Sequence, residues 1–156
     1  EDSNSGYEFF NTIGQENNIL CESAGGKSNI FSKLQSIGQE TVCVIADGAA
    51  IGPEMNRLYE ITERKSNIVL YFPESFEWLI LKSGLVTDGD IKTILQEPEA
   101  YIESKDYFSW ERYFTKLLIE RTQDTYLQYQ KTKLNPVYLH DKIKHTIISV
   151  MQGIIL

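Results

Sequence analysis

The sequence predicts an α/β fold in which a small parallel sheet with flanking helices is followed by a C-terminal helical extension. Short β-branched or apolar segments alternate with amphipathic ones up to about residue 84. Beyond Leu85 only helical spacing remains. Because strands that alternate with helices pair in parallel through crossovers, we expect an α/β domain over residues 1–84 and a helical extension over residues 85–156, packed on it. The 156 residues leave room for one such unit.

The elements of the first half follow from periodicity and from turn residues. Runs of apolar and β-branched side chains indicate the strands, and three-to-four-residue apolar spacing indicates the helices. Pro53 opens one helix, since proline is favoured in a first helical turn. Strands are expected at residues 18–21, 41–46 and 67–72, and helices at residues 6–13, 28–37 and from Pro53 onward.

The second half is expected to hold only packing helices. Thr87 and Asp88 are suitable caps for the first, and Pro98 stands in the first turn of the second. The helices are expected at residues 87–95, from Glu97 onward, at residues 109–123 and at residues 139–154.

Composition excludes several classes of protein. With 42% hydrophobic and 24% charged residues the chain is globular, not disordered. No apolar run approaches the roughly 18 residues of a membrane span, and the N-terminus lacks the pattern of a secretory signal. We therefore expect a soluble, cytoplasmic protein without membrane contact. Cys21 and Cys43 are expected as buried thiols, and the opening at Glu1 leads us to expect a segment upstream.

The charge distribution bears on the partners. The formal net charge is −7, and residues 1–85 contain 12 Asp and Glu against 6 Lys and Arg. Passive binding to a phosphate backbone needs a basic surface, so this balance is unfavourable for it. Carboxylates gathered in this way either face solvent or hold a hard metal ion, and the sequence leaves both readings open.

Acidic residues follow two of the expected strands. Asp47 comes directly after strand 41–46, and Glu74 and Glu77 come after strand 67–72. Ligands of open α/β sheets bind beyond the carboxyl ends of the strands, so these acids could share a divalent ion. Asp47 capping its own loop, and Glu74 or Glu77 favoured by a helix dipole, are the structural alternatives.

Other motifs are weaker. Residues 25–28, Gly-Gly-Lys-Ser, lie in the place of a phosphate-binding loop but lack its first glycine, which favours a tight turn. His140 and His145 are too far apart around a helix to share an ion. Asp88-Gly89-Asp90 is best explained by helix capping, and the aromatic residues between Tyr101 and Tyr138 are expected in the core or an interface, with base stacking as the alternative.

The first half also resembles a known family. Residues 1–5, Glu-Asp-Ser-Asn-Ser, followed by Phe9-Phe10, are similar to the opening of Toprim domains of the OLD nuclease type. Residues 18–29 resemble the second strand and glycine turn of that branch. Residues 47–52, Asp-Gly-Ala-Ala-Ile-Gly, fall on its D-x-D-x-x-G motif, and Glu74 or Glu77 on the acid after the next strand. The resemblance covers residues 1–84 in order.

This resemblance implies a Toprim or Rossmann-like fold and a nuclease that depends on Mg²⁺ or Mn²⁺. Glu1, Asp47 and Glu74 or Glu77 would be the catalytic metal ligands, and nucleic acid the substrate. It also implies an upstream strand and, as in many OLD-type relatives, an upstream ATPase domain as partner.

A non-catalytic interaction or regulatory domain of a larger protein is the alternative function. The second Asp of D-x-D is Ala49, which removes a carboxylate from the site. The acidic first half repels a phosphate backbone unless a metal neutralises it. In this case the aromatic residues of the second half would supply a surface for a protein partner.

Overall fold

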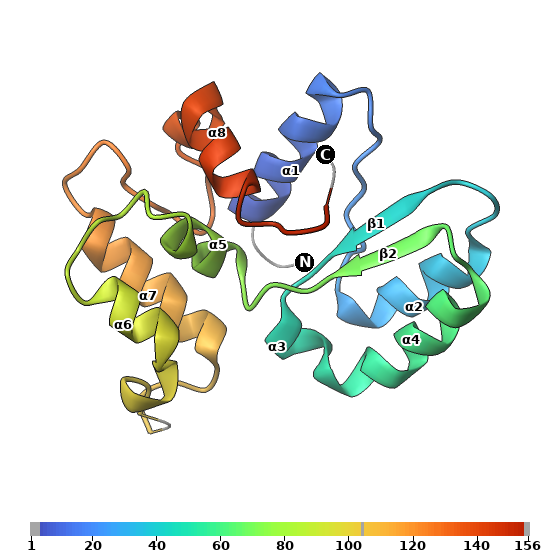
Figure 1. Cartoon of the computed structure of the whole chain (residues 1–156), viewed down its shortest axis with the longest axis horizontal. Helices are drawn as coiled ribbons and strands as arrows, with labels where there is room; N and C mark the ends of the chain where they lie inside the picture. The colour runs from blue at the N-terminus through green and yellow to red at the C-terminus, as the bar shows by residue number, and fades with distance from the viewer. Residues whose placement is uncertain (1–3, 104, 155–156) are drawn as a thin grey trace.

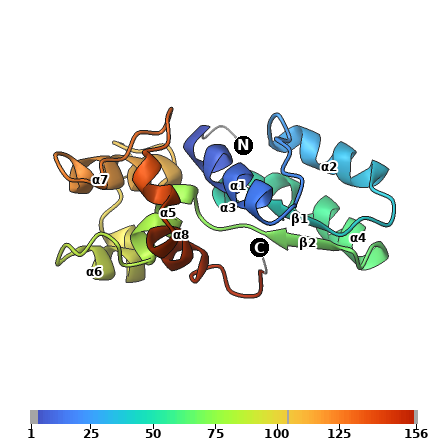
Figure 2. The same cartoon turned by 90° about the horizontal axis from the view of Figure 1, so that it is seen from above.

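The computed structural model describes residues 4–103 and 105–154, with the backbone alone at Ala49. It has the mixed α/β composition that the sequence predicts. Figure 1 shows α5 to α8 gathered on one side, β1 and β2 with α2 to α4 on the other, and α1 between them; Figure 2 shows the same division from above. In chain order the elements are α1 (Asn4–Glu16), α2 (Lys27–Ser36), β1 (Val42–Ile45), α3 (Gly48–Ile51), the 3₁₀ turn η1 (Gly52–Glu54), α4 (Met55–Arg64), β2 (Ile68–Tyr71), α5 (Phe76–Lys82), α6 (Ile91–Gln96), η2 (Pro98–Ala100), α7 (Trp110–Thr122), η3 (Pro136–Leu139) and α8 (Asp141–Ile148).

The sheet is small and parallel, as expected. In the described residues it consists of β1 and β2, paired from Val42 opposite Ile68 to Ile45 opposite Tyr71. The chain between the strands passes through α3, η1 and α4, which is the crossover a parallel pair requires. The carboxyl ends of both strands therefore lie at the same edge.

One face of the sheet packs against α2 and α4. Ile68 and Leu58 are buried in a cluster that we call the smaller core. Its buried members are Ile30, Leu34, Ala46, Ile51, Leu58 and Ile68. On the other face, Ile45 and Tyr71 contact a second cluster, whereas Cys43 and Val69 are exposed. The expectation that Cys43 is a buried thiol is therefore wrong, because alternation along β1 turns it away from the smaller core. Cys21 is half-buried, and both thiols are free.

The second cluster, which we call the larger core, joins the two ends of the chain. Phe9 and Ile13 of α1 pack there with residues of α5, α6, α7 and α8. An ion pair between the buried Lys144 and the exposed Glu16 links α8 to α1. The division between the two cores therefore does not fall at residue 84, where the α/β domain was expected to end, because α1 and α5 belong to the larger core.

The strand expected at residues 18–21 is absent. Helix α1 runs on to Glu16, and Asn18 then adopts the left-handed conformation, with φ of 56°. The amide of Ile19 donates to the carbonyl of Gly14 at 2.7 Å, which closes a C-terminal helix cap. Leu20 is 82% exposed, so the apolar run that indicated a strand forms an uncovered return segment.

Several expected helices of the second half are shorter than predicted. The helix from Glu97 is only the 3₁₀ turn η2, and the helix over residues 139–154 is α8 alone. The helix over residues 109–123 is confirmed as α7, with the Ser109 hydroxyl accepting the capping hydrogen bond from the amide of Arg112 at 3.3 Å. No helix in the described residues is long and apolar enough to cross a membrane.

Candidate functional site

Two of the predicted acids follow the neighbouring strands β1 and β2: Asp47 comes directly after β1, and Glu77 lies in the first turn of α5, which follows β2. Asp47 follows β1 and takes the N-cap position of α3, with a half-buried side chain that makes no capping hydrogen bond. Its carbonyl instead accepts from the amides of Ala50 and Ile51 and so turns the chain into α3.

Gly48 allows the two strand ends to approach closely. Its amide donates to the carbonyl of Pro73 at 2.6 Å. A Cβ at this position would lie 3.0 Å from the carbonyl oxygen of Phe72 and 3.2 Å from that of Pro73. Because only glycine leaves this space, Asp47 is held beside the segment that carries Glu74 and Glu77.

Helix α5 turns Glu77 into the larger core. Ser75 caps the helix, its hydroxyl accepting from the amide of Trp78 at 3.1 Å. Glu77 is only 1% exposed, and its carboxylate accepts a hydrogen bond from the Tyr129 hydroxyl at 2.7 Å. Glu74, one turn earlier, is half-buried. A carboxylate buried so deeply requires compensation, and Tyr129 provides part of it.

Lys131 brings a positive charge to these carboxylates. It follows α7, and its ammonium is ion-paired with Glu111 at the start of that helix. Burial lowers the pKa of Lys131, but the hydrogen bond and charge of Glu111, followed by the charges of Glu77 and Asp47, outweigh it and raise the pKa above its ordinary value. Lys131 is therefore a cation at neutral pH, within electrostatic reach of both predicted acids.

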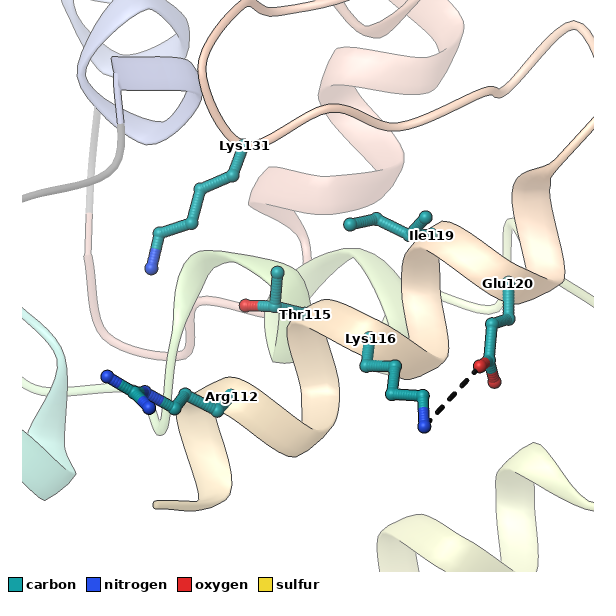
Figure 3. Close-up of a pocket in the computed structure, with 6 residues that line it drawn as sticks. All are labelled: Arg112, Thr115, Lys116, Ile119, Glu120 and Lys131. Atoms are coloured by element: carbon teal, nitrogen blue, oxygen red, sulfur yellow. Dashed lines mark ion pairs between the residues drawn. The ribbon is translucent and has the colours of Figure 1, made fainter. Parts of the chain in front are cut away.

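An open groove of about 450 Å³ lies beside Lys131, along the exposed side of α7 (Figure 3). In Figure 3 the ends of the Lys131 and Arg112 side chains and the hydroxyl of Thr115 point to the same side of α7. The residues that line the groove are Arg112, Thr115, Lys116, Ile119, Glu120 and Lys131. Three cations and one carboxylate line it, which is unusual in a chain of net charge −7.

Whether the candidate site can hold a metal ion depends on which ligand atoms its side chains offer. Carboxylate oxygens are the ligands that Mg²⁺ and Mn²⁺ prefer, and Asp47 and Glu77 offer them. Within residues 4–103 and 105–154, however, no group of three or more His, Cys, Asp and Glu side chains is placed to hold a metal. Glu1, the third predicted ligand, lies outside the described residues. The described part of the site thus supplies two hard ligands and an ammonium, and not a complete metal set.

The remaining sequence candidates have structural roles. Gly25 and Gly26 have positive φ and form a turn before α2, closed by the Asn29 side chain on the Gly25 carbonyl at 3.0 Å. The strand expected before this turn is absent, which removes the context of a phosphate-binding loop. His140 and His145 are both exposed.

Asp88 and Asp90 differ from expectation. Asp90 occupies the N-cap position of α6 without a capping hydrogen bond, Asp88 accepts from the amide of Gly89 at 2.7 Å, and both carboxylates pair with Arg121 of α7. The capping interpretation is therefore wrong for the side chain of Asp90, because the guanidinium offers a stronger, charge-assisted partner.

Sequence analysis did not identify Lys131 or Tyr129 as site residues. Tyr129 was one of many aromatics, and it lies 52 positions from its partner Glu77. No local motif surrounds Lys131, and only folding of the second half onto the strand ends reveals its place. In comparisons with known proteins, no family model, curated protein or solved structure matches the chain.

Proposed function

We propose that the chain is a Toprim-like domain that acts on phosphodiesters of nucleic acid with a bound Mg²⁺ or Mn²⁺. The observation that supports this proposal is that Asp47 follows β1 and Glu77 follows β2, its parallel neighbour, and that the charges of both carboxylates act on the cation Lys131. Carboxylates for a metal and a fixed cation for a phosphate are the groups that phosphodiester chemistry uses.

Each residue has a distinct part in this proposal. Asp47 and Glu77, with Glu1 as the third carboxylate, would hold the ion, which when bound polarises the phosphate and activates water. Lys131 stabilises negative charge on the phosphate oxygens. Tyr129 fixes the orientation of Glu77 through its hydrogen bond, and Gly48 keeps Asp47 against the end of β2.

The test is a cleavage assay on the 156-residue chain with supercoiled plasmid and labelled oligonucleotides, in Mn²⁺, in Mg²⁺ and in chelator. We expect cleavage only with metal. Asp47→Asn and Glu77→Gln should each lower the rate by about 100-fold or more, since metal-centred charge stabilisation is worth several kcal/mol. Calorimetric titration with Mn²⁺ should show the same two variants binding the ion more weakly.

Glu74→Gln is the matched control. Glu74 follows the same strand but lies before α5 and is half-buried, whereas Glu77 is buried within α5 and hydrogen-bonded to Tyr129. The cleavage rate of Glu74→Gln should stay close to that of the unaltered chain. Cleavage that persists in Asp47→Asn, or that Glu74→Gln lowers as strongly as Glu77→Gln, would contradict the assignment.

A non-catalytic binding domain is the second candidate, and one observation favours it. The ammonium of Lys131 already neutralises part of the carboxylate charge, and Ala49 stands where the resembled motif has a further acid. Absence of Mn²⁺ heat in the calorimeter, together with unchanged nucleic-acid or protein binding in Asp47→Asn, would establish this function in place of the metal-dependent one.

A further inference from the structure

The structure separates the aromatic residues of the second half into two sets. Tyr113, Phe114, Tyr129 and Tyr138 are buried in the larger core, as expected from the sequence. Phe108, by contrast, is 86% exposed and Trp110 is 37% exposed. Both stand at the beginning of α7 and line an open hollow of about 260 Å³. A phenylalanine so exposed contributes little to the core, so its place on the surface calls for another explanation.

The exposed aromatics are continuous with the basic groove. The guanidinium of Arg112 lies over the ring of Phe108, 5.3 Å from its centroid, and Arg112 also lines the groove of Figure 3. Lys116 follows one turn later, with its ammonium 5.4 Å from the ring of Tyr107. Lys131 closes the far side of the groove and acts on Asp47 and Glu77. The exposed rings of Phe108 and Trp110 thus adjoin the cations Arg112, Lys116 and Lys131, and we call these five residues the strand path.

A polar atom in the groove also lacks a partner. The hydroxyl oxygen of Thr115 is buried and has no hydrogen-bond partner in the part of the chain that the structure describes. Such groups are rare in folded proteins and commonly bind a ligand or an ordered water. Figure 3 shows this hydroxyl pointing to the same side of α7 as the ends of the Arg112 and Lys131 side chains.

We infer that this path binds a single strand of nucleic acid, with bases stacked on Phe108 and Trp110 and phosphates on Arg112, Lys116 and Lys131. Unpaired bases expose faces that stack on aromatic rings, whereas the bases of a duplex are already stacked on one another. The inference deepens the proposed function and rests on it in one respect, namely that the strand leads to Asp47 and Glu77.

Binding is tested apart from cleavage, in chelator, by fluorescence anisotropy with a labelled oligothymidine and with a duplex of equal length. We expect tighter binding of the single strand. Phe108→Ala and Trp110→Ala should each weaken it about tenfold, in the range found when a stacking ring is removed. Arg112→Ala should reduce the slope of log Kd against log salt by about 0.7, the contribution of one phosphate contact on a single strand.

Helix α4 offers matched controls. Arg57 lies over the ring of Phe31 at 4.2 Å, as Arg112 lies over Phe108, and Tyr59 is 58% exposed. Arg57→Ala and Tyr59→Ala should leave the affinity and its salt dependence unchanged. Thermal unfolding of every variant checks that the surface substitutions leave the fold intact.

Three results would overturn the inference. One is equal or tighter binding of the duplex, and another is equal loss in the α4 controls. The third is absence of oligonucleotide binding at low salt, which would assign the exposed rings to a protein partner. Binding in chelator without cleavage in Mn²⁺ would uphold the strand path and reject the proposed chemistry, whereas cleavage unaffected by Phe108→Ala and Arg112→Ala would do the reverse.

Discussion

The two cores of the molecule differ in size and in how completely they are covered. Among the described residues the larger core has 19 buried members, contributed by both ends of the chain, and the smaller core has 6. On one sheet face Cys43 and Val69 are exposed, whereas Phe114, Leu117 and Leu118 of α7 are covered. The helical part is therefore the more stable of the two by the area of apolar surface removed from water.

The candidate site lies where the two parts meet. Asp47 comes from the strand side, and Glu77 and Lys131 are anchored on the helical side. The segment Phe72 to Ser75 joins the parts, and its carbonyl at Pro73 receives the amide of Gly48. With this arrangement, we expect a substitution that destabilises the smaller core to displace Asp47 relative to Glu77 without unfolding the helices.

The largest expected effect tests whether the parts unfold separately. Phe114 and Leu58 are both fully buried, one in each core. Phe114→Ala should cost about 3–5 kcal/mol and Leu58→Ala about 2–5 kcal/mol. Hydrogen exchange should show that Leu58→Ala lowers protection in β1, β2 and α4 and spares α7, because the larger core does not depend on Leu58.

Phe114→Ala should instead lower hydrogen-exchange protection in both parts, because Ile45 and Tyr71 of the sheet pack against the larger core. Equal loss of protection in α7 and in β2 on Leu58→Ala would contradict the comparison and indicate one cooperative unit.

The sequence predicts those elements whose determinants are local. β-Branched residues give β1 and β2, and Ser109 as cap gives the start of α7. The absent strand at residues 18–21 has a different cause: a single residue, Asn18, takes the left-handed conformation after a longer α1. Apolar residues such as Leu20 then remain exposed, which periodicity does not anticipate.

The candidate site is predictable only in part, because some of its residues are brought together by contacts between distant parts of the chain. Acids after parallel strands follow from topology, and Asp47 and Glu77 do come after β1 and β2, whereas their sharing of an ion stays a prediction. Lys131 and Tyr129 reach them through the packing of α7 against α5, a contact between residues far apart in the chain. The metal and the activity stay predictions, because nothing among the described residues tests them.

A smaller effect is expected at the hydrogen bond that joins Tyr129 to Glu77. Tyr129→Phe removes a donor from a buried carboxylate, a change worth about 1.5–3 kcal/mol. Urea unfolding measures it, with Tyr59→Phe on α4 as a control that should be close to neutral. If Tyr129→Phe changes the free energy of unfolding as little as Tyr59→Phe does, the hydrogen bond from Tyr129 does not hold Glu77 on the helical side.

Alkaline pH should weaken the larger core through Tyr138. This side chain is fully buried, and its hydroxyl donates to the carbonyl of Leu127 at 2.6 Å. Burial raises the pKa of Tyr138 well above its ordinary value. The stability that it contributes is therefore complete below the unfolded pKa of roughly 10 and is lost as the pH rises beyond it, by up to about 1.4 kcal/mol per pH unit.

The measurement is the urea midpoint between roughly pH 8 and 11, a window that spans the unfolded pKa of tyrosine. Tyr138→Phe should cost about 1 kcal/mol at neutral pH, since the Leu127 carbonyl loses its donor. Above the unfolded pKa its stability should fall less steeply than that of the unaltered chain. A parallel decline in both proteins would show that Tyr138 ionises in the folded state as easily as in the unfolded one.

The smallest expected effect concerns the ion pairs of each part. Arg121 joins α7 to Asp88 and Asp90 before α6, while Arg57 pairs with Glu54 within one turn at 3.2 Å. All these side chains are partly exposed, so solvent screens them and each pair is worth about 0.2–1 kcal/mol. Arg121→Ala should cost about 1 kcal/mol and Arg57→Ala about half of that, because Arg121 pairs with two carboxylates and Arg57 with one. Urea unfolding at low salt and at about 1 M NaCl checks this, since screening should reduce the Arg121 effect more than the Arg57 effect. An Arg57→Ala cost equal to or above that of Arg121→Ala would show that the α/β part depends on surface charge as much as the helical part does.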